Sequence, residues 1–170
     1  VLSLARQAVE HYVRTGTLLR PPTPPPGGLS EPAPTFVSLR VGEALRGCIG
    51  TLVATKLTLA DEIIANAVAA AVNDPRFPPV EPRELAALEI SVDVLTPPEP
   101  IDSIRDQDPR VHGLIVQSRR DEWKRGLLLP DLEAIDTAEK QLHYTRVLKA
   151  GITDPHEPVE MYRFRVQRYH

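Results

Sequence analysis

The chain has 170 residues, of which 42% are hydrophobic and 25% charged, and its formal net charge is -3. This is the balance of an ordinary globular domain, and the negative charge disfavours charge-driven binding to nucleic acid or to an anionic membrane. No apolar run approaches the ~20 residues of a membrane span, and the first residues show no signal-peptide pattern, so we expect a cytoplasmic protein that crosses no membrane.

The first half of the chain predicts a helix, a loop, a hairpin, a second helix and a strand, in that order. Apolar residues at helical spacing indicate helices at residues 2–15 and 57–73. Between them, FVSLRVGEALRGCIGTL (36–52) alternates as a β-hairpin does, with its turn at Gly42. EISVDVL (89–95) also alternates, which is typical of a half-buried antiparallel strand.

Two stretches are rich in proline. RPPTPPPGGLSEPAP (20–34) contains seven prolines, and proline has no backbone N–H to donate in a helix or a central strand. We expect an extended surface loop that connects elements of one domain. The alternative is a ligand for a proline-recognition domain. TPPEPI (96–101) is also predicted as a rigid loop.

The second half of the chain predicts a hairpin, a helix and a final strand. RVHGLIVQS (110–118) and RGLLLP (125–130) are the expected hairpin strands, joined by the charged turn RRDEWK. A helix is expected from residue 137 to 150, with Asp136 as its N-cap. VEMYRFRVQRY (159–169) alternates throughout and predicts one continuous strand.

Together these elements predict an α+β fold, in which mostly antiparallel sheet is flanked by helices. Residues 36–94 and 111–167 each offer a hairpin, a helix and a strand. This order indicates a duplicated β-rich repeat, although the two halves share no repeated sequence.

LRGCIG (45–50) holds the only cysteine of the chain, which excludes an intrachain disulfide and a multi-cysteine zinc site. Strand alternation is expected to place Arg46, Cys48 and Gly50 on one face. A nearby cation favours thiolate, Gly50 leaves open space beside the sulfur, and Gly47 lets another element or a ligand approach. This pattern predicts a pocket with a thiol floor and a positive rim, suited to an anionic ligand. Alternatively, the cysteine is a small buried hydrophobe.

DPRFPP (74–79) is the second candidate binding segment. Its prolines restrict the backbone, so that Asp74 and Arg76 are presented in a fixed array. Arg76 is suited to bind a carboxylate or a phosphate. The alternative is a helix stop in which Phe77 fills the core and Arg76 pairs with Asp74 or Glu81.

A base is usually needed beside a cysteine nucleophile. Of the five histidines, His112 is the candidate, because it starts a predicted strand and precedes Gly113. The histidines and carboxylates show no spacing typical of metal ligands. We therefore expect neither a metal nor a cofactor.

LRGCIG and DPRFPP, with blocks such as HGLIV and GLLLPDLEAIDTAEKQL, resemble the AMMECR family over roughly residues 2–168. The resemblance implies one family domain over residues 1–170, built from a larger and a smaller lobe with two similar β-rich repeats. Bacterial members are encoded beside, or fused to, a Memo-like relative of class III extradiol dioxygenases and a radical SAM protein. The resemblance therefore implies these two proteins as partners.

The family motifs cover Leu45 to Gly50, Asp74 to Phe77, and His112 with Gly113, where relatives often have Tyr-Gly. We accordingly expect His112 to bind ligand, together with Gly47, Gly50, Asp74 and Arg76. The resemblance does not supply an established activity.

Two functions follow as predictions. The first is a cysteine-dependent enzyme or a binder of a small anionic ligand, in which Cys48 is nucleophile or redox thiol and Arg46 lowers its pKa and binds the anion. The second is a non-catalytic adaptor that docks the Memo-like or radical SAM partner. In the adaptor, the proline-rich loop or the charged turn at 118–125 would be the contact surface.

Overall fold

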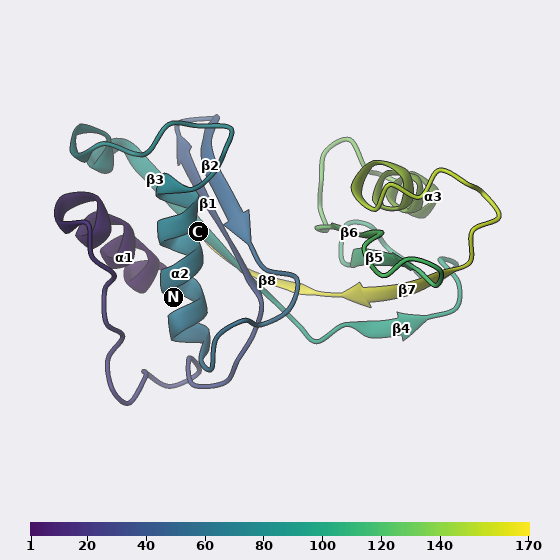
Figure 1. The fold of residues 1–170 in the computed structure, drawn as a ribbon, viewed down its shortest axis with the longest axis horizontal. Coiled ribbons are helices and arrows are strands. Elements are labelled where there is room, and N and C mark those ends of the chain that lie inside the picture. Colours follow the sequence, from purple (N-terminus) through teal and green to yellow (C-terminus); the bar gives the residue numbers. More distant parts are fainter. The chain divides into compact units, whose positions relative to one another are not determined.

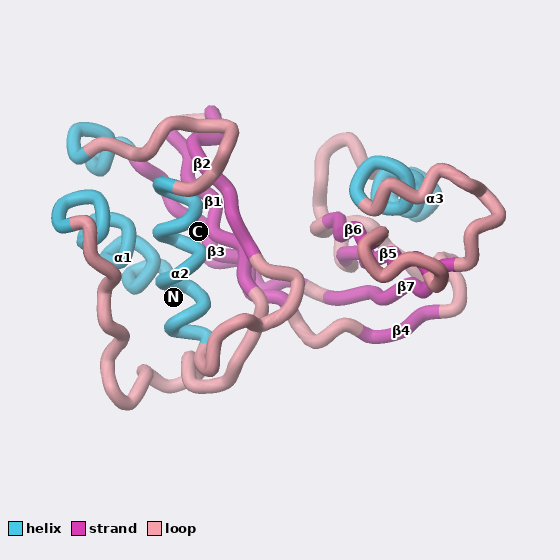
Figure 2. Tube along the Cα trace, viewed as in Figure 1, coloured by secondary structure: helices cyan, strands magenta, loops and turns pink.

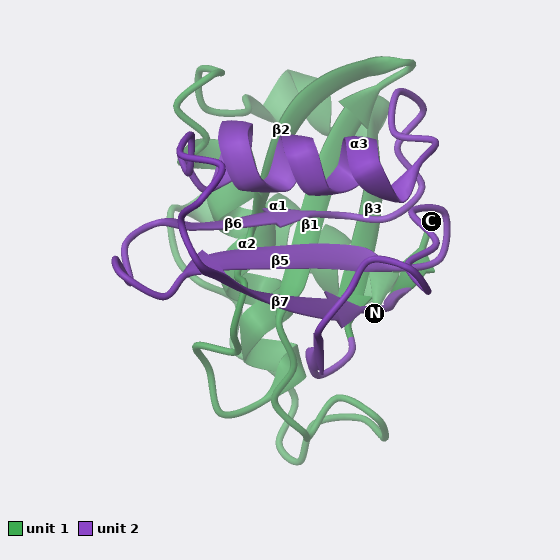
Figure 3. Ribbon diagram, turned by 90° about the vertical axis from the view of Figure 1, so that its right-hand side faces the viewer, with its two compact units in different colours: residues 1–95, 167–170 green, residues 96–166 purple.

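The computed structural model describes residues 1–170 as two compact units, each built around a four-stranded sheet (Figure 3). Unit 1 comprises Val1–Leu95 and Gln167–His170, and unit 2 comprises Thr96–Val166. The chain therefore passes from one unit to the other twice. This arrangement confirms the predicted α+β class and the predicted larger and smaller lobes.

Two helices cover one face of the sheet in unit 1 (Figure 1). The helix α1 (Leu2–Thr15) ends at Gly16, whose φ of 72° is the left-handed conformation that glycine adopts without strain. The helix α2 (Leu59–Val72) begins at Thr58, whose side chain accepts the N–H of Asp61. Neither these helices nor any other helix is long and apolar enough to cross a membrane.

The sheet of unit 1 has the strand order β2-β1-β3-β8. Alternate residues of its central strands, such as Val37, Leu39 and Val92, are fully buried against the helices. The hairpin turns at Gly42, where φ is 58°. The strands are β1 (Thr35–Val41), β2 (Ala44–Gly50), β3 (Leu88–Leu95) and β8 (Val166–Tyr169), and a short 3-10 helix, η1 (Pro82–Ala87), precedes β3.

The proline-rich segment between α1 and β1 forms no helix or strand, as predicted, and runs as a long loop in Figure 2. The part of this loop that leads into β1 is attached to α2. The N–H of Leu59 donates to the carbonyl of Glu31, and the N–H of Ala60 donates to that of Leu29. Leu29 itself is buried in the core of unit 1. The loop is therefore anchored to the domain it belongs to.

Unit 2 is a smaller version of the same design. Its sheet has the order β4-β7-β5-β6, and the helix α3 (Ala138–His143), continued by the π-helix η2 (Tyr144–Lys149), packs on it. Leu114, Val116 and Ile152 form the centre of its core. The strands are β4 (Glu99–Ile101), β5 (Gly113–Ser118), β6 (Arg125–Leu128) and β7 (Val159–Phe164).

Three local predictions in this half are wrong. The N-cap of α3 is Thr137, whose side chain accepts the N–H of Lys140, and not Asp136. TPPEPI is not wholly loop, because its last three residues form β4. The expected strand 159–169 is broken at Arg165 into β7 and β8, which belong to different sheets.

The two units confirm the predicted duplication. In unit 1 a hairpin, a helix and a strand give the spatial order β2-β1-β3, and in unit 2 the same succession gives β6-β5-β7. Each sheet is then completed by a strand that follows the other repeat in the chain. β8 lies beside β3, and β4 lies beside β7.

Candidate functional site

The strand that carries the cysteine contains a β-bulge. Val41 pairs with Ala44 and Arg40 with Leu45, but the register then shifts, so that Leu39 faces Gly47. Arg46 is the extra residue of the bulge. The expected alternation of Arg46 with Cys48 and Gly50 along one face is therefore interrupted.

Cys48 lies on the face of the sheet that is turned away from α2. Its neighbour Gly47 faces the helix, because a Cβ there would lie 2.1 Å from the carbonyl oxygen of Ala70. Cys48 is half-buried, and the hydroxyl of Ser38, directly opposite in β1, donates to its Sγ at 3.2 Å. Ser91 of β3 continues the row on the other side of Ser38. The thiol thus lies against one hydroxyl group, that of Ser38, on the face of the sheet away from α2.

The backbone of Cys48 is bound by the DPRFPP segment. β2 is an edge strand, and the outward N–H of Cys48 donates to Oδ2 of Asp74 at 2.9 Å. The outward carbonyl of Cys48 accepts from Nη2 of Arg76 at 3.2 Å. Arg76 also binds both carboxylate oxygens of Asp74, through Nε at 2.9 Å and Nη2 at 2.7 Å. The pair takes the place of a neighbouring strand and satisfies the open edge. The helix-stop alternative named this pairing, but Phe77 is half-buried and lies outside the core cluster.

Arg76 is the cation beside the thiol. Its hydrogen bond to Asp74 is the main cause that holds the pKa of that buried carboxyl well below its usual range. The pKa of Arg76 is raised, first by Asp74, with smaller contributions from the charge and hydrogen bonding of Cys48. The Arg76 side chain is 55% exposed, and Nη1 makes no hydrogen bond within the protein. The N–H groups of Nη1 are therefore unpaired on a guanidinium that Asp74 and the carbonyl of Cys48 hold in place.

Arg46 is expected from the sequence to act on Cys48, but it binds Glu84 and the DPRFPP segment instead. Its Nε and Nη2 bind the two carboxylate oxygens of Glu84 at 2.7 and 3.0 Å, and Nη1 donates to the carbonyl of Pro78 at 3.0 Å. The guanidinium of Arg46 is the main cause that lowers the pKa of Glu84. None of its hydrogen bonds reaches Cys48, so Arg46 holds the DPRFPP segment against β2.

The two glycines of the motif both serve packing. The approach of another element at Gly47 is confirmed, and that element is α2. The expected open space at Gly50 is wrong, because the ring of Phe36 covers it and a Cβ would lie 2.3 Å from that ring.

His112 belongs to unit 2, whereas the other predicted site residues belong to unit 1. Its Nδ1 accepts the N–H of Asp108 at 3.4 Å, and its carbonyl accepts from the amides of Gln107 and Gln141. Burial lowers the pKa of His112, and the charges of Arg163 and Arg165 lower it further. These contacts all lie within its own unit.

Sequence reasoning missed Ser38 and Glu84. Ser38 is one of many polar residues on an alternating strand, and its place opposite Cys48 depends on the bulge. Glu84 lies 38 residues from Arg46 along the chain. No motif marks either residue, so only the three-dimensional structure identifies them.

The class defined by this architecture is an α+β protein of two repeated units, with a thiol and an arginine at a sheet edge. The AMMECR1 family model matches residues 2–169, and the chain belongs to that family. A Thermotoga maritima protein is 48% identical over 97% of this chain and 94% of its own length. A Clostridium acetobutylicum protein is 39% identical over 99% of this chain, which spans only 35% of that relative. The crystal structure of an uncharacterized Pyrococcus horikoshii protein superposes with a TM-score of 0.85 at 34% identity, covering 98% of this chain and 87% of that one.

Proposed function

We propose that this protein uses Cys48 for thiol-dependent chemistry on, or binding of, a small ligand with an anionic group. The observation that carries the proposal is the fixed guanidinium of Arg76. Asp74 and the carbonyl of Cys48 hold it in place, its side chain is 55% exposed, and its Nη1 makes no hydrogen bond within the protein.

The roles divide among four residues. Cys48 is the nucleophile or redox thiol, the hydroxyl of Ser38 donates to its sulfur, and Arg76 binds its carbonyl. Arg76 also binds the ligand, while Arg46 positions the segment that carries it. Because Asp74 offsets the charge of Arg76, directed hydrogen bonds rather than net charge dominate the binding of the anionic group. A ligand-binding role for His112 stays a prediction.

Replacing Arg76 by alanine is expected to slow the alkylation of Cys48 at pH 7 by about tenfold, because the guanidinium beside the reacting sulfur is lost while the carboxylate of Asp74 remains. The chain has one cysteine, so mass spectrometry after timed exposure to iodoacetamide reads the rate without ambiguity. Inorganic phosphate should protect the wild-type thiol and leave the rate of the Arg76→Ala variant unchanged.

The matched control is Arg83→Ala, which removes an exposed arginine paired with Glu81 and should leave the rate unchanged. If Cys48 reacts only when the protein unfolds, the thiol is a packing residue and the proposal fails. Circular dichroism of each variant separates a local effect from unfolding.

The second candidate function is a non-catalytic adaptor for the Memo-like or radical SAM partners that the family resemblance implies. The exposed Trp123 in the turn between β5 and β6 favours it. Cys48→Ser separates the two candidates, because an adaptor keeps its complex after this change and an enzyme loses activity while keeping the complex.

A further inference from the structure

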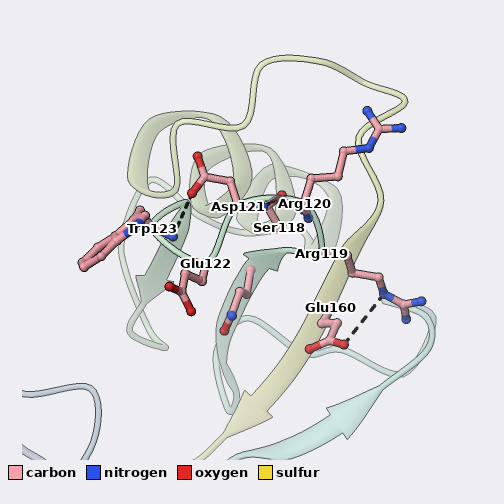
Figure 4. Close-up of a pocket in the computed structure, with 8 residues that line it drawn as sticks. Ser118, Arg119, Arg120, Asp121, Glu122, Trp123 and Glu160 are labelled. Atoms are coloured by element: carbon pink, nitrogen blue, oxygen red, sulfur yellow. Dashed lines mark hydrogen bonds and ion pairs between the residues drawn. The ribbon is translucent and has the colours of Figure 1, made fainter.

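The turn between β5 and β6 exposes the only tryptophan of the chain. Trp123 is 88% exposed, more than nearly every other large hydrophobic side chain of the protein. Beside it lies an open depression of about 620 Å³ (Figure 4). The depression is lined by Gln117, Ser118, Arg119, Arg120, Asp121, Glu122, Trp123 and Glu160.

Hydrogen bonds and an ion pair hold the backbone of this turn in place. The buried hydroxyl of Ser118 accepts the N–H groups of Arg120 and Asp121, and it donates to the carboxylate of Glu157. Lys124 pairs with the other oxygen of Glu157 at 3.3 Å. The backbone closes through hydrogen bonds from Ser118 N to Lys124 O and from Lys124 N to Asp121 O. Little conformational freedom of this backbone is left to be lost when a partner binds.

The backbone N–H of Trp123 is held in place as well, because it donates to Oδ1 of Asp121 at 3.0 Å. An exposed aromatic side chain on an ordered backbone is the type of residue that dominates binding energy in protein interfaces.

Charges are separated across the turn. Figure 4 shows the carboxylates of Asp121 and Glu122 on the same side as the indole of Trp123, while Arg119 and Arg120 point to the other side. Arg119 is directed to Glu160, with Nε 3.9 Å from Oε1. Glu122 has no ion pair or side-chain hydrogen bond. The side of the turn around Trp123 is therefore aromatic and acidic.

We propose that this side of the turn docks a basic segment of a partner protein, with a lysine or arginine side chain over the indole and its cation against Asp121 and Glu122. A cation above an aromatic face is attracted by the ring, and the carboxylates provide the complementary charge. The formal net charge of -3 favours approach of a basic partner. This surface contains none of the residues assigned to the Cys48 site, so each proposal stands or fails without the other.

The test uses a phage-displayed library of random dodecapeptides, panned on the whole protein after depletion on the Trp123→Ala variant. Enriched sequences are expected to carry lysine or arginine, and the synthetic peptides should shift the emission of the single tryptophan to the blue as it is covered. Calorimetry should give affinities about tenfold weaker for Trp123→Ala. Trp123→Phe should keep part of the affinity, since a phenyl face also attracts cations.

Two further variants make the test specific. Glu122→Lys should abolish binding of the basic peptides, whereas Arg120→Ala, on the other side of the same turn, should leave it unchanged. Enriched peptides without basic residues, equal binding to Trp123→Ala, or no enrichment at all would overturn the proposal. So would a dimer in sedimentation velocity that Trp123→Ala abolishes, because it would assign this surface to a second copy of the chain.

Discussion

Replacing Gly47 by alanine is expected to lower the free energy of unfolding by about 3 kcal/mol, at the upper end of the usual range for overpacking. The added methyl carbon would lie 2.1 Å from the carbonyl oxygen of Ala70 in α2. That oxygen belongs to helix backbone, so it cannot turn aside as a flexible side chain would. The clash is relieved only if α2 separates from β2. Urea unfolding, followed by far-UV circular dichroism, measures the loss.

Gly27→Ala is the matched control, because a Cβ at Gly27 meets nothing within 4 Å and the residue does not adopt a positive φ. Its stability should be unchanged or higher by about 0.5 kcal/mol, since alanine restricts the unfolded chain. An unfolding midpoint of Gly47→Ala equal to that of the wild type would show that helix and strand are not in the contact described.

Replacing Glu62 by alanine is expected to lower the free energy of unfolding by about 3 kcal/mol, because hydrogen bonds to a charged group stabilise a fold more than neutral ones do. Glu62 is 1% exposed on α2. Its carboxylate accepts from the hydroxyl of Thr51 and from the N–H groups of Thr55 and Lys56, the latter two at 2.8 Å. The segment that follows the cysteine motif is thereby attached to the helix.

The contribution of Glu62 to the free energy of unfolding should depend on pH. Burial raises the pKa of Glu62, but the hydrogen bonds from Thr51, Thr55 and Lys56 together outweigh burial and lower it. A lowered pKa in the folded state means that this stabilisation is complete above the unfolded value, about 4.3. It is lost as the pH falls through the folded value.

Urea unfolding of the wild type and of Glu62→Gln should therefore differ more at pH 7 than at pH 3. Glu10→Ala is the control, because the Glu10 side chain is 36% exposed and lies 3.7 Å from its partner Arg6. Its effect on the free energy of unfolding should stay below about 0.5 kcal/mol. An equal difference at both pH values would contradict the assigned role of the carboxylate.

The sequence predicts the elements of this fold well wherever apolar periodicity is strong and ends are marked. Helices α1 and α2 have both features, since α1 ends at Gly16 and α2 begins after the N-cap Thr58. The final strand shows the limit. VEMYRFRVQRY alternates without glycine or proline, and nothing within it marks the break at Arg165. The break depends on pairing with two different sheets, which is information about the whole chain.

The sequence marks the two segments that meet at Cys48, but it does not reveal the geometry in which they meet. A two-residue turn without a bulge would place Arg46 opposite Leu39 and Gly47 opposite Ser38. The bulge advances the register by one residue and brings Cys48 to Ser38 instead. That shift changes which residues share a face, and it turns Arg46 toward Glu84. The chemistry of the thiol therefore depends on a one-residue irregularity that periodicity does not reveal.

The crossing of the chain between the sheets also fixes the order in which the protein can be completed during its synthesis. β8, which lies beside β3, is made only after all four strands of the unit 2 sheet. Until then Asp93 of β3 lacks Arg168, its bidentate partner 75 residues later in the chain. The N-terminal unit thus leaves the ribosome with one strand edge unpaired, which exposes it to wrong pairing with neighbouring chains. The sheet of unit 1 is therefore completed only when β8 has been made and has paired with β3.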